Sequence, residues 1–466
     1  MKHIFWGGEH FDMKEHIFRA YDIRGIVDID YREEDVEPLG YAIARLLEEH
    51  DCQEIVVARD ARISSPRIQQ ALLKGLCRSS SLHVYNIGKT PTPVAWFAVD
   101  ALGFDACIMI TASHNPPQDN GCKIRIKDKL INSKDIQQIR NLIQKQLPEI
   151  QSTPTNIDIH KHYFELILRD GRPPPGNWKI VVDGGNGVAG PWMCSLLEMM
   201  NDKDVSIQII PLYCTPDGNF PAHPPDPTVA KNVQDLKTLV LQEKADLGIG
   251  LDGDGDRIAL VLSNGTHVFG DQLLGIFAQD ILTWRKGYVV QDIKCSKAIS
   301  DVIAPLGGIV LTSACGYVNI EKMMRENVAL LGGEMSSHIF FSDRWYGFDD
   351  AIYAAARAIQ ILPKLITLHQ NIPTYISTPE IRIPVTEDQK QQIFSEIQNH
   401  PFFANKKNCS FVDGVRYEDE RGWFLIRPSN TEPKISLRIE SQNEDHFREL
   451  RQDCFGIVQD YHIHLP

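Results

Sequence analysis

The sequence predicts an α/β protein with three topologically similar mixed α/β domains and a smaller C-terminal α+β domain around a central cleft. Three observations lead to this fold class. The chain has 466 residues, too many for a single hydrophobic core. Strand-like and helix-like stretches alternate along most of it, and one pattern recurs three times. After about Pro379 the pattern changes to strands with helices that suggest an antiparallel sheet, which indicates a different last domain.

The repeated unit begins with a β-branched strand followed by an aspartate. It occurs as EIVVARD (54–60), WKIVVDGG (178–185) and GYVVQDI (287–293). Each copy continues through a helix and a second strand to an apolar strand that enters a polar loop, TASHN, DGDGDR or MSSH. Three copies of one unit explain this pattern, and chance echoes between α/β strands are the alternative. Because open α/β sheets bind ligands outside the carboxyl ends of their strands, we expect the three loops to face one cleft.

Helical stretches carry apolar residues at spacings of three and four. They cover residues 37–50, 65–77, 135–147, 232–245, 271–284 and 348–362. We place domain boundaries near residues 157, 266 and 378, which gives domains at 1–157, 158–266, 267–378 and 379–466. The prefix MKHIFWGGEHFD precedes all of the motifs, and we expect it to be a disordered or lightly packed extension.

Composition excludes several classes of protein. The net charge of −13 argues against a general nucleic-acid binder. No apolar stretch reaches the roughly 18 residues that a membrane span needs, and the N-terminus does not resemble a signal peptide. We therefore expect a cytoplasmic protein with no membrane or nucleic-acid partner. Ten scattered cysteines without a CxxC pair predict reduced, mostly buried thiols.

The stretch LDGDGDR (251–257) places three aspartates, Asp252, Asp254 and Asp256, at alternate positions. Three carboxylates can crowd together when a hard cation neutralises them, and Mg²⁺ is the natural candidate. An EF-hand loop is excluded, because Arg257 stands where that loop needs glycine and Ser263 where it needs glutamate. An acidic surface turn is the remaining alternative.

Two stretches satisfy the dinucleotide-binding pattern G-x-G-x-x-G, GNGVAG (185–190) and GIGLDG (248–253). The strand IQIIPLYC that follows the first lacks the terminal acid that a ribose needs, and the aspartates of the second would repel a pyrophosphate. We therefore interpret Gly185, Gly187 and Gly190 as tight-turn and helix-packing residues.

Two further loops carry polar groups. RPSNTEP (427–433) combines a guanidinium with hydroxyl and amide donors, which suits a phosphate or another small oxyanion. GEMSSH (333–338) combines a carboxylate, two hydroxyls and a histidine, which suits sugar hydroxyls and proton transfer. Taken singly, each loop is also compatible with a purely structural turn.

Five motifs in order, FRAYDIRG (18–25), TASHNPP (111–117), LDGDGDR, GEMSSH and RPSNTEP, resemble the α-D-phosphohexomutase superfamily. Within it, the chain is most similar to the bacterial phosphomannomutase/phosphoglucomutase branch. The resemblance covers almost the whole chain. It implies a phosphoserine domain at 1–157, a metal-binding domain at 158–266, a sugar-recognition domain at 267–378 and a C-terminal phosphate-binding domain at 379–466.

The same resemblance implies an isomerase that reversibly transfers a phosphoryl group between O1 and O6 of a hexose phosphate, mannose and/or glucose. The group would pass through a phosphoserine and a hexose 1,6-bisphosphate intermediate and activator, with one Mg²⁺ per chain. The implied partners are small-molecule sugar phosphates, and we expect a monomer or weak dimer. Phosphoglucosamine mutase and a catalytically silent sugar-phosphate-binding protein are the alternatives.

The resemblance also implies roles for individual residues. The phosphoryl group and metal would involve Ser113, His114, Lys123, Arg24, Arg257, Asp252, Asp254 and Asp256. Lys123 or His338 would act as general acid or base. Substrate would be bound by Tyr21, Lys294, Gly316, Tyr317, Glu334, Ser336, His338, Arg427, Ser429, Asn430 and Thr431. One departure from the branch lies at 315–317, where Cys-Gly-Tyr replaces the usual histidine after glycine, so sugar preference stays open.

Overall fold

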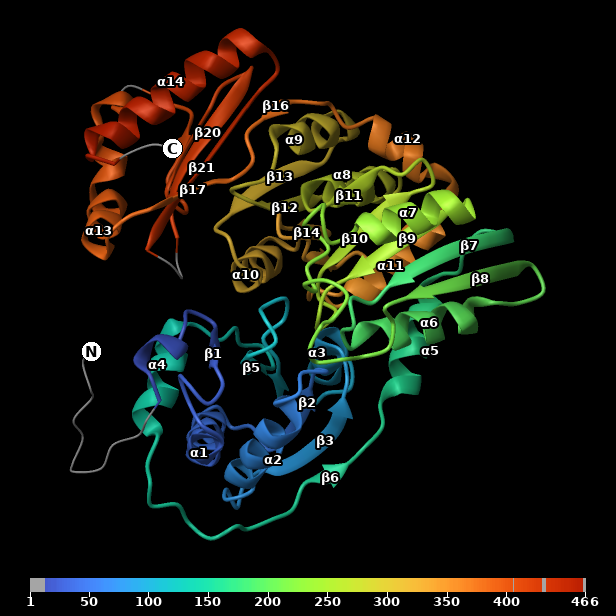
Figure 1. The fold of residues 1–466 in the computed structure, drawn as a ribbon, viewed down its shortest axis with the longest axis vertical. Helices are drawn as coiled ribbons and strands as arrows, with labels where there is room; N and C mark the ends of the chain where they lie inside the picture. The colour runs from blue at the N-terminus through green and yellow to red at the C-terminus, as the bar shows by residue number, and fades with distance from the viewer. Residues whose placement is uncertain (1–12, 405, 430–432, 464–466) are drawn as a thin grey trace. The chain divides into compact units, whose positions relative to one another are not determined.

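The computed structural model describes residues 13–404, 406–429 and 433–463 (Figure 1). The predicted N-terminal extension, 1–12, lies outside the described residues. The chain forms two compact units. The first unit contains the residues up to Phe269 together with Arg344–Leu362, and the second contains Gly270–Asp343 together with the residues from Pro363 onward. Each unit contains two sheets.

The first sheet has the strand order β1-β5-β4-β2-β3-β6. Its strands are β1 (Asp22–Ile26), β2 (Glu54–Arg59), β3 (His83–Lys89), β4 (Ala106–Ile110), β5 (Asp119–Ile126) and β6 (Thr155–Asn156). Its helices are α1 (Glu33–Glu49), α2 (Ser65–Leu76), α3 (Thr92–Asp100) and α4 (Ser133–Leu142). The last of these was predicted to reach residue 147, but Ile143 is extended and ends it. Helices α1 and α2 lie side by side in blue in Figure 1.

Alternation of side chains along the strands explains the core of this sheet. Ile55 and Val57 of β2 pack in one cluster with Ile108 of β4 and with apolar residues of α1, α2 and α4. Val56 points to the opposite face, because successive strand residues alternate, and α3 contacts β2 and β4. Helices therefore cover both faces, which is why these strands are continuously apolar.

The second sheet has the order β11-β10-β9-β7-β8. Its strands are β7 (Gly176–Asp183), β8 (Val205–Leu212), β9 (Leu247–Leu251), β10 (Ile258–Leu262) and β11 (His267–Phe269), and the helices of this part are α5 (His160–Asp170), α6 (Ala189–Met200) and α7 (Gln234–Glu243). The interpretation of the three glycines after β7 is confirmed. Gly185 has a φ of +51°, and a Cβ on Gly190 would lie 2.9 Å from the Cα of Cys214.

The third sheet has the order β13-β12-β14-β15. Its strands are β12 (Tyr288–Asp292), β13 (Ile309–Ser313), β14 (Leu331–Gly333) and β15 (Ile339–Phe341), and its helices are α8 (Asp271–Ile281), α9 (Lys297–Ile303), α10 (Tyr317–Asn327) and α12 (Leu365–Gln370). Strand β12 pairs in parallel with β13 and β14, and β14 pairs antiparallel with β15. The same arrangement occurs around β2 and β7, so the internal repeat is confirmed.

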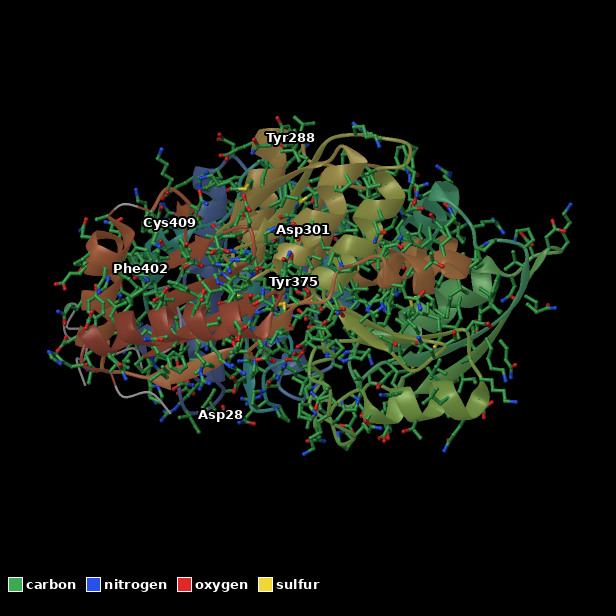
Figure 2. The ribbon with its side chains drawn as sticks, turned by 90° about the horizontal axis from the view of Figure 1, so that it is seen from above. Asp28, Tyr288, Asp301, Tyr375, Phe402 and Cys409 are labelled. Carbon is green, nitrogen blue, oxygen red and sulfur yellow. The ribbon has the colours of Figure 1, made fainter. Side chains whose placement is uncertain are left out.

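The fourth sheet is antiparallel, as expected for a last domain of different fold. Its strands are β16 (Ile376–Ser377), β17 (Ile381–Pro384), β18 (Cys409–Ser410), β19 (Val415–Glu418), β20 (Gly422–Pro428) and β21 (Lys434–Ser441), with α13 (Glu387–Glu396) and α14 (Glu444–Asp460). The hydroxyl of Tyr375, directly before β16, donates a hydrogen bond to Asp301 on α9, and both residues are labelled in Figure 2. The predicted fold class is thus confirmed, and the predicted residue bounds of its domains stay a prediction.

One segment of the predicted third domain, Arg344–Leu362, belongs to the first unit. It contains α11 (Ala351–Gln360), which begins after Asp350 because that carboxylate accepts a hydrogen bond from the Tyr353 amide at 2.8 Å. The same carboxylate accepts hydrogen bonds from the Tyr163 hydroxyl at 2.8 and 2.9 Å and from the Trp345 indole at 3.1 Å. Burial raises the pKa of Asp350 to about 7.

In the described part of the chain, no single helix has the length and apolar character of a membrane span. One bent pair, α11 with the helical stretch up to Gln370, passes the same test by length and composition alone.

Candidate active site

The loop between β9 and β10 brings three carboxylates together. Asp252, Asp254 and Asp256 are completely buried, and each offers an oxygen within 4.8 Å of the others. Three backbone amides of the same loop fold over Oδ1 of Asp252: those of Gly255, Asp256 and Arg257, at 2.8, 3.1 and 3.2 Å. The predicted acid cluster is therefore formed by the local turn that the glycines permit.

Ser113 lies directly against this cluster. Its Oγ donates a hydrogen bond to Oδ2 of Asp252 at 2.9 Å and lies 3.3 Å from Nδ1 of His114. The backbone of Ser113 has a φ of +51°, a left-handed conformation that is costly for a residue other than glycine. Its amide donates to the Thr111 hydroxyl at 2.8 Å, which helps to maintain this conformation. The Ser113 hydroxyl is thus held against one carboxylate of the acid cluster.

Charges within the cluster are only partly balanced by protein groups. Burial, Asp256 and Asp254 raise the pKa of Asp252 well above its usual range. The Lys123 ammonium donates to Oδ2 of Asp254 at 2.8 Å and also contacts Asp256. Burial alone would lower the pKa of Lys123, but Asp254 and Asp256 outweigh it, so the pKa is raised and Lys123 is an ammonium.

The donor set fits a hard divalent cation. Carboxylate oxygens are the ligands that Mg²⁺ and Ca²⁺ prefer. Among the described residues, Oδ1 of Asp254 is a buried oxygen with no hydrogen-bond partner, and such an orphaned oxygen is costly unless it binds a ligand. Arg257 and Lys123 both lower the pKa of Asp252, but burial and the neighbouring carboxylates outweigh them. The cluster can therefore hold a metal ion.

Arg24 on β1 forms hydrogen bonds with the loop that carries Ser113. Its Nη1 donates to the carbonyl oxygen of Ala112 at 3.3 Å and to Oδ1 of Asn115 at 3.1 Å, and its Nη2 donates to Asp22 at 2.6 Å. Its Nε has no partner in the part of the chain that the structure describes. A buried guanidinium with a spare donor, bonded to the loop that carries Ser113, suits a phosphoryl group.

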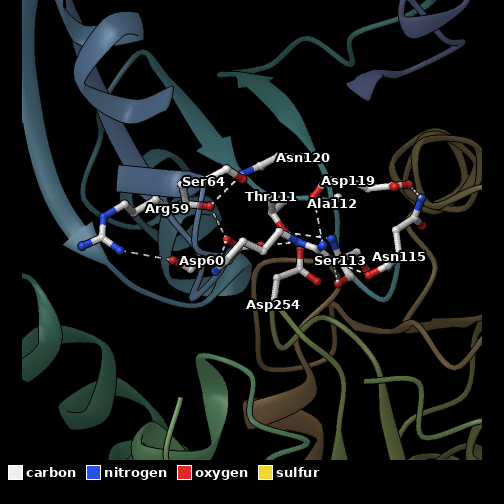
Figure 3. Close-up of polar contacts among 12 residues, drawn as sticks. Arg59, Asp60, Ser64, Thr111, Ala112, Ser113, Asn115, Asp119, Asn120 and Asp254 are labelled. Carbon is white, nitrogen blue, oxygen red and sulfur yellow. Dashed lines mark hydrogen bonds and ion pairs between the residues drawn. The ribbon is translucent and has the colours of Figure 1, made fainter. Parts of the chain in front are cut away.

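Arg62, which the sequence analysis missed, organises the same loop. Its side chain is fully buried, and each of its nitrogens donates a hydrogen bond. Nη2 donates to the carbonyl oxygens of Ser113 and Asn115, each at 2.7 Å, Nη1 donates to those of Pro116 at 2.5 Å and Asp119 at 2.9 Å, and Nε donates to Asp60 at 3.1 Å. Figure 3 shows this loop with Asp60, Ser113 and Asp254.

A weak signal for Arg62 existed in the sequence. Asp60 is the aspartate that follows the first strand of the repeat, and its Oδ1 accepts hydrogen bonds from the Arg62 amide at 3.0 Å and the Ser65 hydroxyl at 2.5 Å. An arginine two residues after a strand-end aspartate is a candidate for such a pair. Its targets, however, are backbone carbonyls, which leave no trace in a residue pattern.

The second unit brings together the predicted sugar-binding residues of GEMSSH. Nδ1 of His338 lies 2.8 Å from Oε2 of Glu334 and 3.3 Å from the Ser336 hydroxyl. The Gly316 amide donates to Oε1 of Glu334 at 2.6 Å, and the ring of Tyr317 lies 6.3 Å from that of His338. Burial would raise the pKa of Glu334, but His338 outweighs it and the pKa is lowered. The result is a buried carboxylate–imidazole pair.

The predicted phosphate-binding residues lie in the same unit. Nε of Arg427 donates to Oδ2 of Asp413 at 2.7 Å, and the Cys315 amide donates to the same oxygen at 3.1 Å. Asp413, which the sequence analysis did not single out, therefore links Arg427 to the 315–317 loop. The Lys294 amide donates to Asp292 at 2.8 Å.

Three residues of RPSNTEP and two of the first unit complete the predicted set. The Ser429 amide donates to the carbonyl oxygen of Lys434 at 2.8 Å, whereas Asn430 and Thr431 lie outside the described residues. Tyr21 is half-buried directly before β1, and Arg257 is half-buried at the end of the acid loop. The structure does not test the roles assigned to any of these side chains.

Comparisons with known families match the chain over most of its length. Residues 15–149, 161–265 and 269–373 match the phosphoglucomutase/phosphomannomutase α/β/α domains I, II and III, and residues 380–457 match the C-terminal domain of the same family.

Individual relatives agree with this match. A phosphomannomutase/phosphoglucomutase of Pseudomonas aeruginosa is 39% identical over 443 residues, which cover 93% of this chain and 94% of that protein. A phosphoglucomutase of Neisseria meningitidis is 33% identical, covering 95% and 96%. A crystal structure of a phosphoglucomutase/phosphomannomutase family protein from Burkholderia thailandensis superposes with a TM-score of 0.89 at 31% identity, covering 97% of this chain and 100% of the other.

Proposed function

Because this chain belongs to the phosphoglucomutase/phosphomannomutase family, we propose that it is an isomerase that moves a phosphoryl group between O1 and O6 of a hexose phosphate. The substrate would be a mannose or glucose phosphate, the sugars named in its relatives. The observation that carries the proposal is the 2.9 Å hydrogen bond from Ser113 Oγ to Asp252, one of the three clustered aspartates.

Ser113 would carry the phosphoryl group between the two ends of the sugar. The phosphorylated serine donates its group to the free O1 or O6 hydroxyl of a hexose phosphate, and after the resulting 1,6-bisphosphate reorients, the serine hydroxyl takes back the other phosphoryl group. Phosphoryl transfer depends mainly on in-line positioning and charge neutralisation. Arg62 binds the carbonyl oxygen of Ser113, and Arg24 binds the side chain of Asn115. These two arginines would hold the loop in place and so position the Ser113 hydroxyl.

Asp252, Asp254, Asp256 and the Ser113 phosphate would hold a divalent cation, and Mg²⁺ is our candidate. When bound, the ion neutralises negative charge on the transferring group. Lys123 is already an ammonium between Asp254 and Asp256, so it can donate a hydrogen bond or a proton to a nearby oxygen.

The second unit would contribute recognition of the sugar. Glu334 accepts hydrogen bonds from hydroxyl groups, and His338, oriented through Nδ1 by Glu334, holds or moves a proton at its other nitrogen. Arg427, with Ser429, Asn430, Thr431 and Lys294, would bind the nonreacting phosphate. A monomer or weak dimer in the cytoplasm, without nucleic-acid or membrane partners, stays our expectation.

The test combines mass spectrometry with an assay. The peptide that contains Ser113 should gain the mass of one phosphate after incubation with glucose 1,6-bisphosphate, and Ser113→Ala should lose both this mass and all turnover of glucose 1-phosphate and mannose 1-phosphate. Ser336→Ala serves as a hydroxyl control that keeps the phosphate. A fully active Ser113→Ala variant contradicts the proposal, and faster turnover of glucosamine 1-phosphate would favour the phosphoglucosamine alternative.

A further inference from the structure

Two thiols of the first unit meet beside the second sheet. Cys194 lies on α6, Cys214 lies two residues after the end of β8, and their sulfur atoms are 3.8 Å apart. Both side chains are half-buried, as is Cys409, whereas the remaining cysteines are buried. A disulfide needs a sulfur–sulfur distance of about 2.05 Å. The pair therefore needs only a small movement to form one.

The two sulfurs differ in chemical character. The two sulfur atoms share a hydrogen bond, and this contact with Cys214 lowers the pKa of Cys194. The pKa of Cys214 is raised, first by Cys194 and then by burial. Since the thiolate is the nucleophile, Cys194 is the attacking thiol and Cys214 the resolving thiol. By contrast, burial raises the pKa of Cys409, which is labelled in Figure 2.

Cys214 is packed tightly against the glycine loop that follows β7. A Cβ added to Gly184 or Gly190 would lie 3.1 or 2.9 Å from the Cα of Cys214, so the backbones have no slack there. Helix α6, which carries Cys194, starts one residue before Gly190. A movement that draws the two sulfurs together is therefore transmitted to both ends of this loop.

The glycine loop in turn supports the acid loop of the candidate active site. The Val188 amide donates to the carbonyl oxygen of Gly253 at 3.1 Å. A Cβ on Gly187 would lie 2.8 Å from the same oxygen and 2.9 Å from the carbonyl oxygen of Asp252. The loop that carries Asp252 therefore rests directly on the glycine loop, which packs against Cys214 at both of its ends.

We propose that Cys194 and Cys214 form a peroxide-sensitive dithiol site, and that their oxidation to a disulfide lowers the mutase activity. The Cys194 thiolate attacks one oxygen of hydrogen peroxide and becomes a sulfenic acid, while the other oxygen leaves as water after protonation. The Cys214 sulfur then attacks the sulfenic sulfur, a disulfide forms and a second water leaves. Two thiols lose two electrons and peroxide gains them, and a dithiol reductant reverses the reaction.

The experiment uses the full chain, reduced, freed of reductant and treated with hydrogen peroxide. Peptide mapping without reductant should show one linked species that contains Cys194 and Cys214 and lacks two hydrogen atoms. We expect kcat to fall about tenfold or more, since misplacement by about 1 Å near a reacting group can cost about a hundredfold. Dithiothreitol should restore both the mass and kcat.

Matched variants separate the parts of the proposal. Cys194→Ser and Cys214→Ser should remain active and keep their activity in peroxide, whereas Cys409→Ser should lose activity as the wild type does. The linked peptide is measured without any assay, so its absence overturns the dithiol site whatever the chain catalyses. The effect on turnover rests on the proposed function. A linked peptide with unchanged kcat overturns the coupling to the acid loop.

Discussion

Arg62 donates a hydrogen bond from Nη2 to the carbonyl oxygen of Ser113 at 2.7 Å, and Ser113 has a left-handed backbone. Such a conformation costs about 1–3 kcal/mol and persists only where its surroundings determine it. The buried guanidinium supplies that constraint, because four carbonyl oxygens of the loop and the carboxylate of Asp60 accept its hydrogen bonds. Arg62 is thus a positioning residue for the proposed nucleophile.

Replacing Arg62 by lysine should therefore lower kcat more than it changes KM. A lysine cannot reproduce the planar fork of donors, so the loop loses its fixed geometry while the substrate-binding side chains stay in place. We expect a fall in kcat of about a hundredfold. Steady-state kinetics measure the split between kcat and KM.

The matched control for this change is Arg59→Lys. Arg59 is half-buried on β2 and donates to the carbonyl oxygen of Asp60 at 3.3 Å, so its replacement should leave kcat close to that of the wild type. Added guanidinium ion should partly restore an Arg62→Ala variant. Equal loss in both lysine variants, or no effect of guanidinium on Arg62→Ala, would count against the positioning role.

Gly253→Ala should disturb the carbonyl oxygen of Ser113, the same oxygen that accepts a hydrogen bond from Arg62. A Cβ at this position would lie 2.6 Å from the Ser113 oxygen, which neither backbone can accept without moving. We expect kcat to fall about tenfold or more. Gly250→Ala is the control on the preceding strand, because its nearest neighbour is a side-chain carbon at 3.3 Å. Similar activities for the two variants would show that the approach to Ser113 is unimportant.

Removal of divalent cations should stop turnover, and Mg²⁺ should restore it. Because a ligand that binds only the folded state raises its stability, Mg²⁺ should also raise the melting temperature of the metal-free wild type. Asp254→Asn should lose this shift, since Oδ1 of Asp254 is a buried acceptor with no hydrogen-bond partner among the described residues. Differential scanning calorimetry at constant ionic strength measures the shift, with NaCl as the control salt. A full Mg²⁺ shift in Asp254→Asn would refute the ligand assignment.

Stability should fall as the pH rises from about 4 to about 7 through Asp350. Its pKa in the folded state is raised to about 7 by burial, so the folded chain retains a proton that the unfolded chain has released. The free energy of unfolding therefore declines across this window and is level above it. We expect Asp350→Asn to remove on the order of 1–3 kcal/mol of this decline.

Melting temperatures at pH 5 and pH 8 test this expectation. The difference between the two pH values should be smaller in Asp350→Asn than in the wild type. Asp445→Asn, a change at an exposed carboxylate on α14, should leave it unchanged. An identical pH dependence in the wild type and Asp350→Asn would exclude Asp350 as the source.

The residues that sequence reasoning found share one property. Ser113 and the three aspartates lie in short motifs directly after apolar strands, where residue type and spacing report the chemistry. The repeat was visible for the same reason, since strand-end aspartates are local features. Arg62 was missed because its partners are carbonyl oxygens, and Asp350 because one of its donors, Tyr163, lies 187 residues away in the chain.

The parallel pairing of β2 with β4 aligns Arg59 with Ile110, and the chain leaves both strands toward Arg62 and Ser113. A slip of one residue would turn every side chain to the opposite face. The guanidinium would then miss its carbonyls, and the serine could not be charged with phosphate. A chain with a shifted strand would therefore lack the geometry around Ser113 on which the proposed function depends.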